Sequence, residues 1–136
     1  MNRNFNLHRE ALVTTAQAFT TGWVDIGAEI EMLGFNALGV WATLDVNAAS
    51  NMRIRAIAKL DLAGANEYFL PIKTVGATVI SVEDEYYEFN KDEDAKYVLS
   101  VETDGLIPYV QLQIQVGTDG GADAEVDRLE ITKVWK

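Results

Sequence analysis

The stretch from position 38 to position 62 constrains the fold of this chain more than any other. Every even position from 38 to 46 is apolar, and so is every even position from 52 to 62. Strict alternation over such runs is typical of half-buried β-strands, because successive side chains point to opposite faces of a sheet. The sequence therefore predicts two strands here, each with one buried face.

The short polar segment between the two runs favours pairing them with each other as an antiparallel hairpin. Pairing Val46 with Met52 places all the even, apolar positions on one face. The same register sets Trp41 beside Ile57 on the other face, as a cross-strand pair. A slip by one residue would set the apolar row against the charged row, so the alternation favours this register over its neighbours.

Similar runs recur along the rest of the chain. The clearest is 109–116, where apolar residues are expected to face inward and Gln111, Gln113 and Gln115 outward. Glycine, proline and aspartate mark turns between the runs. About eight or nine strands without a convincing helix predict an all-β fold, an antiparallel two-sheet sandwich. A jelly-roll-like arrangement is preferred, because eight strands in two sheets would fill a chain of this length. An immunoglobulin-like sandwich is the alternative.

The length of 136 residues suits one domain with a full hydrophobic core. Residues 1–10 contain Arg3, His8 and Arg9 and little else that is charged, so we expect an N-terminal arm there rather than a core element. Residues 11–136 are then the single β-sandwich domain. The arm is expected either to reach a neighbouring subunit or to be a disordered, tag-like terminus.

The composition argues against several classes of partner. The chain has 11 basic and 21 acidic residues, which gives a net charge of −10. A uniformly acidic domain is repelled by nucleic acid and by anionic membrane surfaces, so neither is expected as a partner. No apolar run approaches the ~18–20 residues needed to span a membrane. The absence of cysteine excludes disulfides and thiolate metal sites.

Groups suited to catalysis are scarce in the sequence. The single histidine, His8, falls in the predicted arm, and none of the serines lies in a Gly-x-Ser-x-Gly elbow. No glycine-rich phosphate-binding motif is present either. We therefore expect no enzymatic activity and no cofactor. A small hydrolase that uses acidic loops is the least favoured hypothesis.

Two acidic segments, 83–94 and 119–127, supply the remaining candidates for a site. Residues 90–94 place oxygen ligands at alternate positions, as the start of a calcium loop does. They lack the glycine and the distant bidentate glutamate of an EF-hand. Solvated loops are the preferred interpretation, and the weak candidates for metal binding are Asp92, Asp94, Asp119 and Asp123.

A stripe of basic residues is the best candidate for a partner surface. Basic side chains alternate with Ile57 along the second predicted strand, on the face expected to carry Trp41. A mixed apolar and basic face is typical of an intersubunit contact, although ion pairs on a solvated face are an alternative. The candidate interface residues are Arg3, Arg9, Trp41, Arg53, Arg55, Ile57 and Lys59. Because aromatic residues can stack on sugars, a carbohydrate-binding or receptor-binding module is the second hypothesis.

Segments 20–27, 38–46 and 110–123 together resemble the small virion accessory proteins of tailed bacteriophages. The likeness covers most of the chain and lies in strand order and loop chemistry. It implies a jelly-roll or related sandwich that decorates or cements a capsid lattice, frequently as a trimer and without enzymatic activity. The expected partners are then a major capsid protein and further copies of this chain. The expected location is the capsid surface of a virion assembled in the host cytoplasm.

Overall fold

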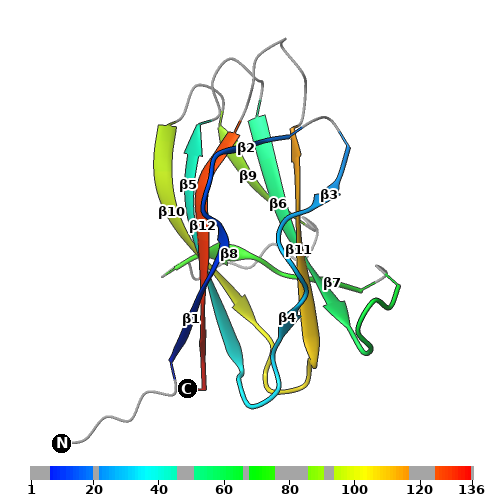
Figure 1. Ribbon diagram of the computed structural model, residues 1–136. Coiled ribbons are helices and arrows are strands. Elements are labelled where there is room, and N and C mark those ends of the chain that lie inside the picture. Colours follow the sequence, from blue (N-terminus) through cyan, green and yellow to red (C-terminus); the bar gives the residue numbers. More distant parts are fainter. Residues whose placement is uncertain are drawn as a thin grey trace, which may run out of the picture.

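The computed structural model describes residues 7–19, 22–45, 51–65, 68–75, 86–90, 94–116 and 125–135 (Figure 1). Within these ranges the chain forms twelve β-strands and no helix, so none of the described residues belongs to a helix that could cross a membrane. All strand pairs are antiparallel, and the strands form two six-stranded sheets packed face to face. The predicted all-β, two-sheet sandwich is confirmed.

Sheet A has the strand order β1-β12-β5-β10-β8, and β2 also pairs with β12. Its strands are β1 (His8–Val13), β2 (Gln17–Ala18), β5 (Ala37–Asp45), β8 (Lys73–Thr74), β10 (Asp94–Glu102) and β12 (Glu125–Val134).

Sheet B has the order β3-β11-β6-β7, with β4 also pairing with β11 and β9 with β6. Its strands are β3 (Val24–Asp25), β4 (Ile30–Glu31), β6 (Asn51–Lys59), β7 (Tyr68–Leu70), β9 (Tyr87–Asn90) and β11 (Tyr109–Val116).

The long-range pairing is nested, as in a jelly roll. The outermost pair joins β1 to β12, and the next joins β3 and β4 to β11. Inside these, β5 pairs with β10, and β6 pairs with β7 and β9. Grouping β1 with β2, β3 with β4, and β7 with β9 gives eight principal strands, and β8 is a two-residue addition at the edge of sheet A. This nesting is the jelly-roll arrangement that the sequence favoured.

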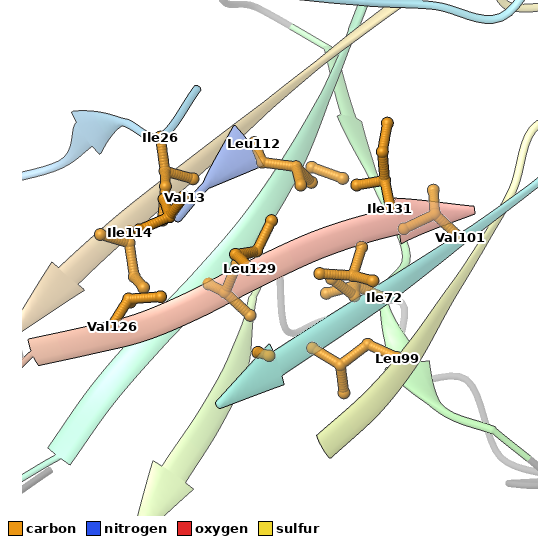
Figure 2. Packing of buried hydrophobic residues seen from close by; sticks show 14 of the residues in the cluster. Val13, Ile26, Ile72, Leu99, Val101, Leu112, Ile114, Val126, Leu129 and Ile131 are labelled. Atoms are coloured by element: carbon orange, nitrogen blue, oxygen red, sulfur yellow. The ribbon is translucent and has the colours of Figure 1, made fainter. Parts of the chain in front are cut away.

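The core lies between the two sheets and is built from the alternating apolar positions. Figure 2 shows Leu129 and Ile131 of β12 and Leu112 and Ile114 of β11 among the side chains of the core, and all four are fully buried. Each such burial stabilises the fold by about 1.5–3 kcal/mol relative to exposure. The even positions of β5 and β6 face this core as predicted. The predicted run extended to Leu62, but β6 ends at Lys59, and Leu60 and Leu62 are exposed.

The predicted hairpin between the two opening runs is wrong. β5 pairs with β10 and β12 in sheet A, whereas β6 pairs with β11, β7 and β9 in sheet B. Trp41 and Ile57 therefore lie on opposite sides of the sandwich, and Val46 is outside the described residues. Alternation specifies which face of a strand is buried but not which strand is its neighbour. Both runs still face one core because the chain changes sheets between residues 45 and 51.

Two local predictions can be compared with the structure. The strand over 109–116 is confirmed at both ends. The predicted arm, in contrast, overlaps sheet A, because β1 begins at His8 and pairs with β12 from that residue onward. Arg9 is therefore part of an edge strand, and Arg3 lies outside the described residues.

Candidate interaction surfaces

The outer face of sheet B is covered by side chains of the same molecule. The Arg55 guanidinium lies between two aromatic rings, with Cζ 4.1 Å from the ring centroid of Trp23 and 4.9 Å from that of Phe69. Such cation–π contacts stabilise a partly desolvated cation. Because β6 and β11 pair in register, Arg55 lies opposite Gln113. Its Nε and Nη2 donate hydrogen bonds to Gln113 Oε1 at 2.9 and 2.7 Å.

The glutamines of β11 complete this cover. Gln113 Nε2 donates to Asp25 Oδ1 at 2.7 Å, so its amide joins β3 to β6 across β11. Gln111 Nε2 donates to the carbonyl oxygens of Leu112 at 2.9 Å and Gly27 at 3.3 Å. Both glutamines point outward from the core as predicted, yet both are buried. Buried amides of this kind are stable only when hydrogen-bonded, as these are.

Two more residues of β6 are buried on the same face. Ile57 has no exposed surface, and Lys59 is 6% exposed. Lys59 Nζ lies 3.5 Å from Glu29 Oε1, and both carboxylate oxygens of Glu29 accept a hydrogen bond from the backbone N–H of Ala63 at 2.9 and 3.0 Å. Ile57 and most of Lys59 are thus covered by their own chain, and the small exposed part of Lys59 lines a groove at one end of the sandwich.

Arg53 lies at the margin of this cover. Its Cζ is 4.8 Å from the ring centroid of Tyr86, and its Nε donates to Glu88 Oε1 at 2.7 Å. The Tyr86 and Trp23 rings are 6.1 Å apart and tilted by 46°. The basic side chains of β6 thus contact aromatic rings and polar groups of the same molecule. These partners are distant in sequence, so the local pattern could not predict them.

The outer face of sheet A is different, because an exposed tryptophan lies at its centre. Trp41 is 48% exposed, between Val98 of β10 and Glu130 of β12. Its Nε1 donates to Thr132 Oγ1 at 3.0 Å. A Cβ at Gly39 would collide with that hydroxyl oxygen, so glycine allows the side chain of Thr132 to reach Trp41.

Next to Trp41, charged side chains join β1 to β12. Arg9 Nη2 donates to both carboxylate oxygens of Glu130, at 2.9 and 3.1 Å. Arg128 Nη2 donates to Glu130 Oε1 at 3.0 Å. The hydrogen bond from Arg9 is the largest cause that lowers the pKa of Glu130; burial opposes it, and Arg128 adds to it. Glu130 is therefore held as a carboxylate.

Arg9 and Trp41 are the two predicted interface residues that the structure brings together. With Leu7, Glu130 and Thr132 they line a groove of about 330 Å³. The other described members of the predicted interface, Arg53, Arg55, Ile57 and Lys59, lie on the opposite sheet.

A second group of exposed apolar side chains lies at one end of the sandwich, where β6 and β10 end and β5 and β11 begin. This is the lower end of the ribbon in Figure 1. Large apolar side chains that are more than half exposed occupy turns and strand ends there. We call this surface the apolar end and define it by Leu33, Leu60, Leu62, Tyr68, Leu106 and Trp135.

Two adjoining grooves shape part of the apolar end. One, of about 340 Å³, is lined by Leu60 and Tyr68, and the other, of about 320 Å³, by Leu106 and Thr103. Leu70 and Ile107 line both grooves. The buried Thr103 hydroxyl has no hydrogen-bond partner among the described residues. The sequence holds one signal of this surface, since Leu60 and Leu62 continue the apolar alternation beyond the last residue of β6.

Little of the predicted metal chemistry falls on described residues. Asp92, Asp119 and Asp123 lie outside them, and Asp94 begins β10, where its backbone pairs with that of Asp45. In the described part of the chain, no three acidic or histidine side chains are grouped closely enough to hold a metal ion. His8 packs edge-on against the Phe35 ring at 5.2 Å.

Comparison with known protein families and with curated proteins finds no match to this chain.

Proposed function

We propose that this protein is a non-enzymatic structural protein of a bacteriophage virion, which decorates or cements the capsid surface as a homo-oligomer. Its partners in this proposal are the major capsid protein and further copies of the chain, with three copies as in many of the proteins that it resembles. The observation that carries the proposal is the apolar end.

The apolar end has the character of a contact surface. Monomeric soluble proteins rarely expose a large contiguous apolar patch, and larger ones usually mark sites of interaction. Fully burying an apolar side chain contributes about 1.5–3 kcal/mol. Covering the exposed half of six such side chains therefore contributes roughly 5–9 kcal/mol.

That gain favours attachment through several copies at once. Association costs about 4–15 kcal/mol in lost translational and rotational freedom, so a single apolar end binds weakly. An oligomer that presents several ends to a regular lattice binds through effective concentration, without any further type of contact. The net charge of −10 also suits a position outside the shell, away from packaged nucleic acid.

Co-sedimentation tests this proposal. The probe is a shell assembled from the major capsid protein encoded nearest to the gene of this chain. We expect the wild-type chain to sediment with these shells. Leu60→Gln combined with Leu106→Gln should reduce the bound fraction at least tenfold, whereas Val24→Gln, an exposed apolar position outside the apolar end, should not. Wild-type protein that stays in the supernatant at about 50 µM, or a gene with no capsid gene near it, would overturn the proposal.

The alternative is a carbohydrate-binding or receptor-binding module, and the observation in its favour is the proximity of Trp23 and Tyr86. Their 46° tilt does not form a flat platform, and the guanidinium groups of Arg55 and Arg53 occupy ring faces that a sugar would need. A glycan array followed by tryptophan quenching tests this function. Saturable quenching that Trp23→Ala abolishes would favour the module over the capsid protein.

A further inference from the structure

We infer that copies of this chain associate through the outer face of sheet A, with Trp41 at the centre of the contact. The inference rests on the proposed function, since it names the surface that would build the homo-oligomer. It begins from the contrast between the outer faces of the two sheets. On sheet B, Ile57 is fully buried under the molecule's own side chains, whereas on sheet A, Trp41 is 48% exposed.

The Trp41 side chain can be buried against another molecule without losing a hydrogen bond. Its one polar atom, Nε1, already donates to Thr132 Oγ1 at 3.0 Å. Covering the ring therefore removes apolar surface from water without leaving an unpaired N–H group. The hydrogen bond also fixes the ring before association, which lowers the entropic cost of contact. Buried tryptophans near the centre of an interface frequently carry much of the binding energy.

The charges on this face point to a second copy as the occupant. At the paired positions whose side chains are described and point outward, four residues are basic and four are acidic, so these positions carry no net charge on a chain of net charge −10. Two such chains repel each other through most of their surfaces but not through this one. A face that carries both signs can also pair with its own copy. These residues are Arg9, Lys73, Lys96, Arg128, Asp45, Glu102, Glu125 and Glu130.

The size of the face fits the same occupant. β5 has nine residues and spans about 30 Å, and the path from β1 to β8 crosses four strand spacings, or about 19 Å. The product, roughly 600 Å², is an upper bound because β1 and β8 are shorter than β5, and it lies at the lower end of the ~600–1,000 Å² per partner of specific interfaces. Neighbouring strands of sheet A contribute side chains on both sides of Trp41, so the ring would lie inside such a contact.

Light scattering on the full chain during size-exclusion chromatography tests the inference. At about 50 µM we expect a mass of two or three times 15.0 kDa. Trp41→Gln should lower the mass to that of one chain, and so should Val98→Lys, which places an unpaired charge beside Trp41. Circular dichroism should show that both variants remain folded. Trp135→Gln, an exposed tryptophan at the apolar end, is the matched control and should keep the wild-type mass.

A wild-type mass of 15.0 kDa at 50 µM, or an unchanged oligomer in both sheet A variants, would overturn the inference. The measurement contains no capsid, so its outcome is separable from the test of function. Oligomers that do not co-sediment with capsid shells would overturn the proposed function but not the sheet A contact. Shells that bind a chain of monomeric mass would overturn the sheet A contact and the oligomeric part of the proposed function, but not the attachment to capsids.

Discussion

Ile57 and Trp41 each lie on a nine-residue strand and point away from the same core, yet their surroundings are opposite. Ile57 is fully buried between Gln111 of β11 and Phe69 of β7, whereas Trp41 is 48% exposed. The chain thus uses connecting segments to protect one outer face, and the described residues leave the other open. The covered face serves stability, and the open one is available for contact.

The largest test of this contrast compares aliphatic truncations on the two outer faces. Ile57→Ala should lower the free energy of unfolding by about 2–4 kcal/mol, because it leaves a cavity under the cover of sheet B. Val98→Ala, beside Trp41 on sheet A, should cost less than about 1 kcal/mol, since Val98 is only half buried. Urea unfolding at low micromolar protein measures both. Equal losses would show that the two outer faces are equally well packed.

The next test concerns the polar part of the cover. Gln113→Glu keeps an oxygen for Arg55 but replaces the amide donor to Asp25 with a second carboxylate. We expect a loss of about 1–3 kcal/mol in unfolding free energy, because the donor is lost and two like charges come together at a partly buried contact.

Asp25→Asn is the matched compensating change. Its amide can donate to the new carboxylate, so the double variant should recover most of the lost stability, and Asp25→Asn alone should cost little. If the double variant is as unstable as Gln113→Glu, the amide bridge between Asp25 and Arg55 is not what stabilises this cover.

The sequence predicted the faces of the strands well and their partners poorly. Alternation identified the buried rows of β5, β6 and β11, and turn residues such as Asp104 and Gly105 separated the strands correctly. Both have positive φ, and Leu106 N donates to Thr103 O at 2.9 Å, as in a tight turn between strands. A hairpin and a crossing between sheets produce the same alternation, so the pattern alone could not decide between them.

The candidate surfaces depend still more on distant pairing. Arg9 donates a hydrogen bond to Glu130, which is 121 positions away in the sequence, and Gln113 donates one to Asp25, which is 88 positions away. Local patterning contains no information about such pairs. Gln111 and Gln113 were predicted to face outward, which is correct, but the segments that bury them come from elsewhere in the chain. The exposure of a polar residue on an outward face therefore depends on whether other segments of the fold pack over it.

The smallest expected effect comes from the ion pairs on the open face. The pKa of Glu130 is lowered chiefly by the hydrogen bond from Arg9, so ionisation of this carboxyl favours the folded state. Its contribution should be fully present above the ordinary pKa of a glutamate and should disappear as the pH falls through the lowered value. Glu130→Gln should therefore melt slightly below wild type at pH 7, with the difference vanishing in acid. The difference stays small because Arg9 and Arg128 are largely exposed.

Melting curves of both proteins from pH 7 down to about pH 3 measure this difference, and 0.5 M salt should shrink it at pH 7. A difference that grows as the pH falls would contradict the assigned direction of the pKa shift. A difference as large as that of Ile57→Ala would place much of the stability of the fold on sheet A's outer face. That result would remove the contrast between the faces, because polar pairs on an open surface would then stabilise the molecule as strongly as a buried side chain.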